Sequence, residues 1–530
     1  MFGIQGKRDS RSTKHRNTSD VVGVSGLRHA LNPGQLGFLT TKELEPYHGL
    51  IGQELGLEAV QFGIDVRSDN FNIFAVGPLG VGKLTAITRL LEETTPHWGQ
   101  PSDWVYVNNF VDANKPLAIE MSPGHGPQFA RMMVNAIDEL RVGLPAMFQS
   151  DEYVTRRRSI DLSFESNQED AIENLIEMAY TKNVQVLRTP SGFTMMPLEN
   201  GEPLEPEEFQ QKPVGERRVV EAKIQDLERQ LGELFQSFPA QQKVRTEKLL
   251  ALNADMAKNI VATALQSVRK SFQAYEKIIR YLHAVEYDLI RHVGLFLGEE
   301  PSDVLIKGHI ETEDDPQFRR YMVNVLVSRD QSEQKGGPIV KEANPTLSNL
   351  LGRVESISDS GNELTDFNMI RPGVMHLANG GVLLLDAAKL LENNFAWEGI
   401  KRALLTKQID IESPIDDGSV SRPVTLSPEP IPLHLKVILF GERELYYKLK
   451  EVDPEFSNIF KIQAEFEDVI PRTPENELTY ARIIAGIIAK HALNPIDAIG
   501  VGRIIEHSSR QAGDGQKLYI NFVTLQDVLI

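Results

Sequence analysis

The chain has 530 residues, with 56 lysines and arginines against 74 aspartates and glutamates and a formal net charge of −18. This length exceeds a single hydrophobic core and predicts about two to four domains. The acidic balance argues against broad binding to nucleic acid or anionic membranes. The absence of cysteine excludes disulfides, thiolate zinc sites and a cysteine nucleophile.

The N-terminal segment and the hydropathy pattern bear on location. No apolar run approaches the roughly 18 residues of a membrane-spanning helix, so no membrane partner is expected. The first residues are basic and lack the apolar segment of a secretion signal. Residues 1–42 are expected to form a flexible tail, with a targeting peptide at the start of the chain as the alternative. The cysteine-free composition suits a reducing compartment such as the cytoplasm.

Strand-like and helix-like segments alternate between about residues 43 and 204. A helical pattern at 51–66 precedes the apolar run 71–76, a second helical segment follows, and another strand is expected at Trp104–Phe110. Alternation of this kind predicts an α/β fold with a parallel sheet.

The stretch GPLGVGKLT, from Gly77 to Thr85, lies between an expected strand and an expected helix, which is the context of a phosphate-binding loop. Gly77, Gly80 and Gly82 let backbone N–H groups surround phosphates, and Lys83 supplies positive charge to their oxygens. The pattern predicts a nucleotide site; a glycine turn that binds nothing is the alternative.

Leu84 departs from this motif. The residue after the lysine is normally a serine or threonine whose hydroxyl binds Mg²⁺. Thr85 does not simply replace it, because one step along a helix rotates the side chain by about 100°. Magnesium would then depend on phosphate oxygens, water and a carboxylate elsewhere in the chain.

The pattern becomes helical between residues 205 and 300, with a break at Ser237-Phe238-Pro239. Spacing by four and three positions predicts a helical hairpin with coiled-coil packing, inserted into the α/β region. Two helices of an ordinary bundle are the alternative. The apolar positions that carry the pattern are Val220, Ile224, Leu227, Leu231 and Leu234 before the break, and Val261, Leu265, Val268, Phe272, Tyr275, Ile279 and Leu282 after it.

Strand signals return in a second α/β part, residues 301–470. Asp386 ends the apolar run GGVLLLD, an arrangement typical of the carboxylate that holds magnesium in P-loop ATPases. A helix N-cap at the end of a buried strand is the alternative. The next residue is Ala387, where such enzymes usually carry the glutamate that polarises the attacking water; Glu392 and Glu398 lie downstream.

Residues 471–530 are helical in pattern and predict a separate all-α domain. The chain ends on apolar residues, with Leu529 and Ile530 last. A fragment boundary inside a structural element is therefore expected at this end.

Taken together, these segments resemble the AAA+ module of Lon-type ATP-dependent proteases, in particular Lon-related bacterial proteins whose ATPase core carries a long helical insertion. The resemblance covers the chain from about Glu43 onward, in the order of the family. The stretches that carry it are ELEPYHGLIGQELGLEAVQFGI, NIFAVGPLGVGK, DWVYVNNF, NPTLSNLLGRVE, RPGVMHLANGGVLLLDAAKLL, WEGIKRALLTKQIDIES, LSPEPIPLHLKVILFGERELYY, DPEFSNIFKIQAEFEDVIPRTPENE and SSRQAGDGQKL.

The resemblance implies an AAA+ core with a helical lid, ATP and Mg²⁺ as cofactors, Lys83 on the phosphates and Asp386 on the metal. It makes Arg510 the candidate for the lid arginine that reads the γ-phosphate, with a surface arginine as the alternative. Glu442 or Arg443 occupies the sensor-1 place without the usual asparagine or threonine. Ile459 stands near the place of the arginine finger.

The function implied is the ATPase and unfoldase portion of a Lon-like serine protease. It would form a homo-oligomeric ring, expected to be hexameric, and act on unfolded or damaged proteins. A serine–lysine peptidase domain would follow Ile530. Two alternatives remain: a nucleotide-binding scaffold with weak or no hydrolysis, suggested by Leu84 and Ala387, and a ring ATPase that remodels partners without proteolysis.

Overall fold

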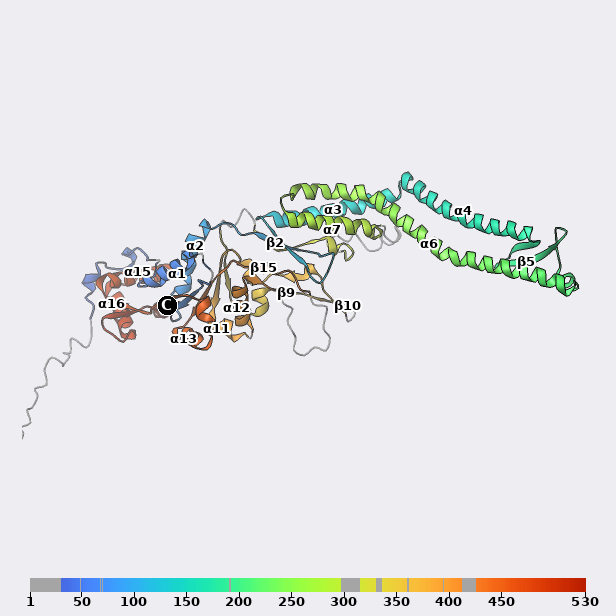
Figure 1. Cartoon of the computed structure of the whole chain (residues 1–530). Coiled ribbons are helices and arrows are strands. Elements are labelled where there is room, and N and C mark those ends of the chain that lie inside the picture. The colour runs from blue at the N-terminus through green and yellow to red at the C-terminus, as the bar shows by residue number, and fades with distance from the viewer. Residues whose placement is uncertain are drawn as a thin grey trace, which may run out of the picture. The chain divides into compact units, whose positions relative to one another are not determined.

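The computed structural model (Figure 1) describes residues 30–47, 49–66, 68, 70–189, 192–296, 315–329, 336–359, 362–393, 395–411 and 426–530. These residues divide into two compact units. The core unit comprises residues up to 103, residues 122–124 and residues 326–530, and the helical unit comprises residues 104–121 and 125–325. Within the described residues no helix is both long and apolar enough to cross a membrane.

A five-stranded, wholly parallel sheet forms the centre of the core unit. Its three central strands consist mainly of buried apolar residues, as expected where both faces of a parallel sheet are covered by helices. This sheet confirms the predicted α/β class. In spatial order the strands are β17 (Ile462–Glu465), β1 (Ile73–Val76), β16 (Lys436–Gly441), β13 (Val382–Asp386) and β8 (Ile339–Glu342).

Successive residues of β1 point to opposite faces of the sheet and enter two different cores. Ile73 and Ala75 pack in one core with the helices at 54–65 and 83–94, whereas Phe74 and Val76 pack in the other with the helices at 396–406, 443–452 and 456–459. The core unit is therefore a three-layered α/β/α structure. Its covering helices are α1 (Glu54–Asp65), α2 (Lys83–Thr94), α11 (Ala387–Glu392), α12 (Ala396–Thr406), α13 (Arg443–Val452) and α14 (Phe456–Ile459).

Short elements connect these layers. They are α9 (Leu347–Leu351), β9 (Arg353–Val354), β10 (Ile357–Asp359), β11 (Asn362–Leu364), β12 (Ile370–Arg371), α10 (Val374–Leu377), β14 (Gln408–Ile409) and β15 (Ile431–Pro432). The strands among them form antiparallel pairs, β9 with β12, β10 with β11 and β14 with β15.

The C-terminal domain is helical but not all-α as predicted. Helices α15 (Pro474–Lys490), α16 (Ala498–Gln511) and α17 (Phe522–Leu529) are joined by an antiparallel pair, β18 (Val469–Pro471) with β19 (Lys517–Tyr519). The two strands are too short to show a period of two in the sequence, which is why the pattern missed them.

Part of the expected N-terminal tail belongs to this C-terminal domain. Leu36 and Phe38 are buried in its core, and the backbone N–H of Thr41 donates to the carbonyl of Ile496 at 2.9 Å. The prediction that residues up to 42 form a flexible tail is therefore wrong for residues 30–42. The preceding residues, 1–29, lie outside the described residues.

The helical unit begins earlier in the chain than predicted. The strand expected at Trp104–Phe110 exists as β2 (Asp103–Val107), but it pairs with β3 (Leu117–Met121) and β7 (Val323–Val327) in a sheet of its own. Two long helices, α3 (His125–Phe148) and α4 (Asp151–Thr181), then precede residue 205. The insertion expected at 205–300 is thus only part of a larger helical unit. The sequence pattern missed α4 because only four of its side chains, Tyr153, Phe164, Leu175 and Ala179, are buried.

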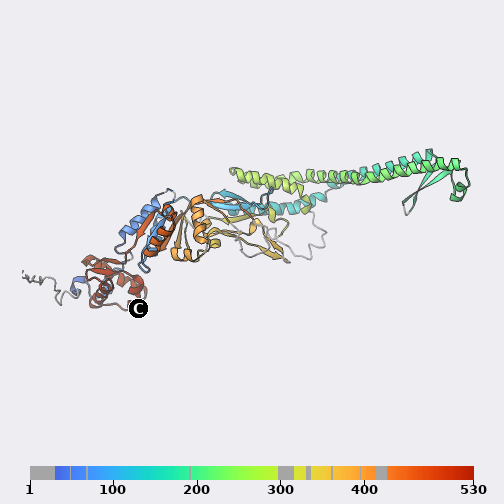
Figure 2. The same ribbon diagram turned by 60° about the horizontal axis from the view of Figure 1, so that its bottom comes forward.

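The helix break expected at Pro239 is also corrected. Helix α6 (Val214–Ser271) runs through Pro239 without interruption, and the reversal comes later, between Phe272 and Tyr275, before α7 (Glu276–Arg291). A proline inside a helix costs about 3 kcal/mol. Packing on both sides of the proline offsets this cost, with Leu227 in an apolar cluster and Arg245 paired to Asp161 of α4 at 2.7 Å. Figures 1 and 2 show α4 and α6 running side by side.

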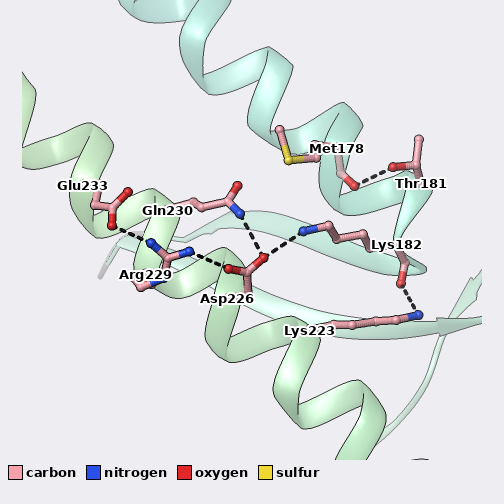
Figure 3. A network of polar contacts seen from close by, with 8 residues as sticks. All are labelled: Met178, Thr181, Lys182, Lys223, Asp226, Arg229, Gln230 and Glu233. Atoms are coloured by element: carbon pink, nitrogen blue, oxygen red, sulfur yellow. Dashed lines mark hydrogen bonds and ion pairs between the residues drawn. The ribbon is translucent and has the colours of Figure 1, made fainter.

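The end of α4 and the start of α6 are connected by a small antiparallel sheet and a short helix, which form the distal junction. The sheet consists of β4 (Val184–Thr189), β5 (Gly192–Glu199) and β6 (Glu202–Pro203), and the helix is α5 (Pro206–Gln210). Asp226 of α6 organises a polar network there (Figure 3), accepting hydrogen bonds from Lys182 at 2.9 Å, Arg229 at 2.7 Å and Gln230 at 2.9 Å. The hydrogen bonds from Lys182 and Arg229 lower the pKa of Asp226 from 3.8 to about 2.

Replacing Asp226 is expected to loosen this junction. Its folded-state pKa lies below the usual value, so the network contributes fully above about pH 4 and is lost as the pH falls toward 2. Asp226→Ala should speed amide hydrogen exchange in residues 175–189 at pH 7. Asp170→Ala, an exposed α4 carboxylate that accepts only from Ser166 among the described residues, should not. Equal exchange rates in both variants would contradict the assigned role.

Candidate functional site

The loop between β1 and α2 has a backbone path that requires glycine. Gly80 and Gly82 have φ angles of +87° and +82°, which side-chain-bearing residues rarely adopt. A Cβ atom on Gly82 would also lie 2.9 Å from a methyl group of Leu50. The loop therefore has the left-handed backbone conformation in which consecutive N–H groups point toward the same side.

The N–H groups of this loop are available for an anion. Among the described residues, the amides of Gly80, Val81, Gly82, Lys83 and Leu84 donate no hydrogen bond to the protein. They precede or begin α2, whose N-terminus carries a partial positive charge. Free amides at a helix N-terminus fit the phosphate groups of a nucleotide.

Lys83 is held at the base of the loop. Its side chain is buried, and Nζ donates to the carbonyl oxygens of Gly77 and, at 3.2 Å, of Gly441. Burial lowers the pKa of Lys83 from 10.5 to about 8, and the negative charges of Glu442 and Asp386 partly oppose that effect. The amine is thus still protonated at pH 7, in a position where a phosphate would replace carbonyl partners.

Asp386 lies at the same edge of the sheet. It ends β13, and its Oδ1 accepts a hydrogen bond from the N–H of Lys389 at 3.1 Å, as an N-cap of α11. Strand β16 separates β13 from β1, a distance of about 10 Å for two strand spacings. The N-cap geometry uses one carboxylate oxygen and leaves the other for a metal.

A pocket of about 470 Å³ brings most of the predicted site residues together. The predicted residues that line it are Gly80, Gly82, Lys83, Leu84, Thr85 and Asp386. Gly77 does not line the pocket, and its carbonyl accepts a hydrogen bond from Lys83. The other lining residues come from β8 and its following loop (Lys341, Glu342, Ala343), from β13, β16 and α11 (Leu384, Leu385, Phe440, Lys389), and from Leu79, Phe522 and Val523.

Arg510 is not among the residues that line this pocket. It is exposed in the last turn of α16. The C-terminal domain instead approaches the loop through the start of α17, where Asn521 Nδ2 donates to the carbonyl of Leu79 at 3.0 Å and the N–H of Phe522 donates to that of Gly80 at 2.9 Å. No sequence motif marked these two residues.

The sensor-1 and arginine-finger positions are likewise outside the pocket lining. Glu442 is the exposed N-cap of α13, and Arg443 forms an ion pair with Glu465 at 3.6 Å. Ile459 is fully buried in the core unit. None of these three side chains lines the pocket, although Glu442 is near enough to raise the pKa of Lys83.

The donor set fits magnesium only with help from a bound phosphate. Within the described ranges no three histidine, aspartate or glutamate side chains gather as a metal-binding group. Magnesium commonly keeps several waters and takes one or two carboxylates plus phosphate oxygens. Asp386 could supply one such carboxylate, and the free amides of the loop would hold the phosphates.

Three segments match known protein families. Residues 335–467 match the family described as a LonB-like AAA domain, residues 103–136 match the Lon-like LonC helical domain, and residues 495–530 match the lid domain of the archaeal LonB AAA+ ATPase. The first range contains β8, β13 and β16 but not the loop at Gly77–Lys83. The matches support an AAA+ ATPase core related to the Lon family.

Two curated proteins described as Lon protease homologs are similar over part of the chain. The protein from Escherichia coli strain K12 is 32% identical over 28% of this chain and 25% of its own length, and that from Haemophilus influenzae is 28% identical over 30% and 26%. The matched part thus spans about a quarter of each relative.

Solved structures add little. NtrX from Brucella abortus is 14% identical, covering 48% of this chain and 56% of its own, at a TM-score of 0.23. A second structure of the same protein in complex with ADP is 15% identical, covering 50% and 58%, at a TM-score of 0.18. Scores this low carry no structural argument.

The lowered pKa of Lys83 predicts that ATP binding is linked to proton uptake. The free site loses its positive charge as the pH rises through about 8, whereas phosphate would keep the amine protonated. Affinity should therefore fall above pH 8, by up to about tenfold per pH unit. Calorimetric titrations between pH 6.5 and 9.5, in buffers of different ionisation enthalpy, measure both effects. Lys83→Ala should bind weakly and with no such slope; an equal slope in this variant would refute the assignment.

Proposed function

We propose that this chain binds and hydrolyses ATP as an AAA+ ATPase module. One observation carries the proposal: a single edge of the parallel sheet presents Lys83, the free amides of the loop and Asp386 to the same pocket. A phosphate cradle facing a carboxylate at the ends of parallel strands is the arrangement that phosphoryl transfer requires. The family matches over β8 to β17 and over the lid support the same conclusion.

In this mechanism the chain's own residues bind and orient the nucleotide. The backbone N–H groups of residues 80–84 would donate hydrogen bonds to the phosphate oxygens. The amine of Lys83 would leave the carbonyls of Gly77 and Gly441 and bind the β and γ phosphates. Asp386 would hold Mg²⁺, which when bound neutralises charge that develops on the phosphates. Phe522 and Val523 would cover the pocket from the lid side.

The cellular role that we propose follows the Lon relatives. The module would assemble into a homo-oligomeric ring and use ATP to act on damaged or unfolded proteins. It would deliver these proteins to a serine–lysine peptidase domain. Arg510 remains a proposed γ-phosphate sensor, which would need a movement of α16 because its side chain is exposed and outside the pocket lining.

Two observations favour a second candidate, a nucleotide-binding scaffold with little turnover. Leu84 brings an alkyl side chain to the pocket where a magnesium hydroxyl is usual, and Ala387 is buried where a glutamate is usual. Each tenfold loss in rate corresponds to about 1.4 kcal/mol in the barrier. Losing both groups without replacement would therefore leave binding with turnover near background.

Substitutions in the loop separate these two functions. The parent chain is expected to turn over ATP with Mg²⁺, Lys83→Ala to bind ATP weakly and lose turnover, and Leu84→Thr to turn over faster because it restores a hydroxyl ligand. Steady-state phosphate release and equilibrium binding are measured on each variant. Lys448→Ala, an exposed lysine of α13, is the matched control. A parent that binds ATP without turnover, rescued by Leu84→Thr, would establish the scaffold instead.

The paired helices α4 and α6 are proposed to engage protein substrates. Replacing residues 165–241 with a short flexible loop removes the distal part and keeps the Asp161–Arg245 ion pair that closes the remaining stem. Basal ATP turnover should be unchanged, because the pocket is built from the core unit. Stimulation of turnover by an unfolded model protein such as casein should be lost. Full stimulation in the shortened variant would contradict this role.

A further inference from the structure

The position after Asp386 is closed to a catalytic carboxylate in this fold. Ala387 is only 1% exposed and packs in the core between the sheet and α12 to α14, and it does not line the pocket. A glutamate there would place its charge in an apolar core, at a high cost in desolvation. A water-polarising group, if the site turns over ATP, has to come from another element.

The next strand of the sheet supplies a carboxylate. Glu342 is the last residue of β8, which pairs in parallel with β13 so that Glu342 is the Cα partner of Leu385, the residue before Asp386. Adjacent strands lie about 4.8 Å apart, so Glu342 and Asp386 lie on neighbouring strands at the same edge of the sheet. Glu342 is among the residues that line the pocket, together with Lys83 and residues of the phosphate loop.

One oxygen of the Glu342 carboxylate is hydrogen-bonded to the neighbouring backbone. Oε1 accepts a hydrogen bond from the N–H of Asn344 at 2.6 Å. In the described part of the chain, Oε2 makes no hydrogen bond or ion pair. The nearby lysine of α11, Lys389, donates instead to the carbonyl of Ala343 at 3.4 Å. One oxygen is thus fixed in place while the other can accept a proton from water.

The two downstream glutamates are poorer candidates. Glu398 forms an ion pair with Lys401 at 2.8 Å, on α12. Glu392 is exposed at the end of α11. Neither side chain lines the pocket.

We infer that Glu342 is the catalytic carboxylate that orients and deprotonates the attacking water, in place of a glutamate at position 387. This inference rests on the proposed ATPase function. The water oxygen forms a bond to the γ phosphorus as the bond from that phosphorus to the β–γ bridging oxygen breaks, with its electron pair leaving on ADP. The water proton passes to Oε2 of Glu342 and from there to the inorganic phosphate.

The test compares Glu342→Gln with Glu392→Gln, a matched change at an exposed glutamate. Glutamine keeps the size of the side chain and can still accept from Asn344, but it takes no proton from water. Glu342→Gln should lower turnover by about 100-fold or more, the lower range for loss of a general base. Its equilibrium affinity for ATP should stay within about threefold of the parent, and unhydrolysed ATP should be recovered from the complex after single-turnover mixing. Glu392→Gln should match the parent.

A second variant guards against a merely structural effect. Glu342→Asp keeps a carboxylate and should retain more turnover than Glu342→Gln at the same thermal midpoint. Parental turnover in Glu342→Gln would overturn the assignment of Glu342 alone. A parent that neither binds nor hydrolyses ATP would overturn the proposed function, and the role of Glu342 with it.

Discussion

The parallel register of the central sheet is the constraint on which the rest of the site depends. Val76 of β1 is paired with Gly441 of β16, and Phe440 of β16 with Asp386 of β13. Because of this register, the C-terminal ends of β1, β13 and β16 lie at one edge of the sheet, although these strands are spread between residues 73 and 441 of the chain. The carbonyl of Gly441 shows the result, because it accepts both the N–H of Gly77 at 3.1 Å and the amine of Lys83 at 3.2 Å. The loop and the lysine are thus anchored to a strand that lies more than 350 residues away in sequence.

Two departures from the usual P-loop arrangement have different structural consequences. Leu84 leaves the cradle intact, because the proposed phosphate contacts would come from backbone amides and not from that side chain. Ala387 lies in the apolar core, so restoring the usual glutamate there would disturb packing. The neighbouring strand β8 ends at the same edge, and it offers Glu342 without any change to the core. A sheet edge built from several strand ends can therefore carry the same chemistry from a different strand.

The predictable part of the fold and site follows from strong local signals. The glycine loop, the apolar strands at 73–76, 382–386 and 436–441 and the helical C-terminal domain each have a pattern readable in sequence. The errors concern long-range packing: Pro239 lies inside a helix stabilised by partners over 80 residues away, and Leu36 and Phe38 join a core made by the last 60 residues. The pocket residue Glu342 ends a four-residue strand, and only the pairing of β8 with β13 places it at the sheet edge where Asp386 lies.

A crystal structure of the chain with Mg²⁺ and a non-hydrolysable ATP analogue tests the central claim most directly. The account predicts the β and γ phosphates within hydrogen-bond distance of the amides of residues 80–84. It also predicts Lys83 moved from the carbonyls of Gly77 and Gly441 to the phosphates, with Asp386 next to the metal. A nucleotide bound elsewhere, or a loop whose Lys83 keeps both carbonyl partners beside a bound nucleotide, would contradict it.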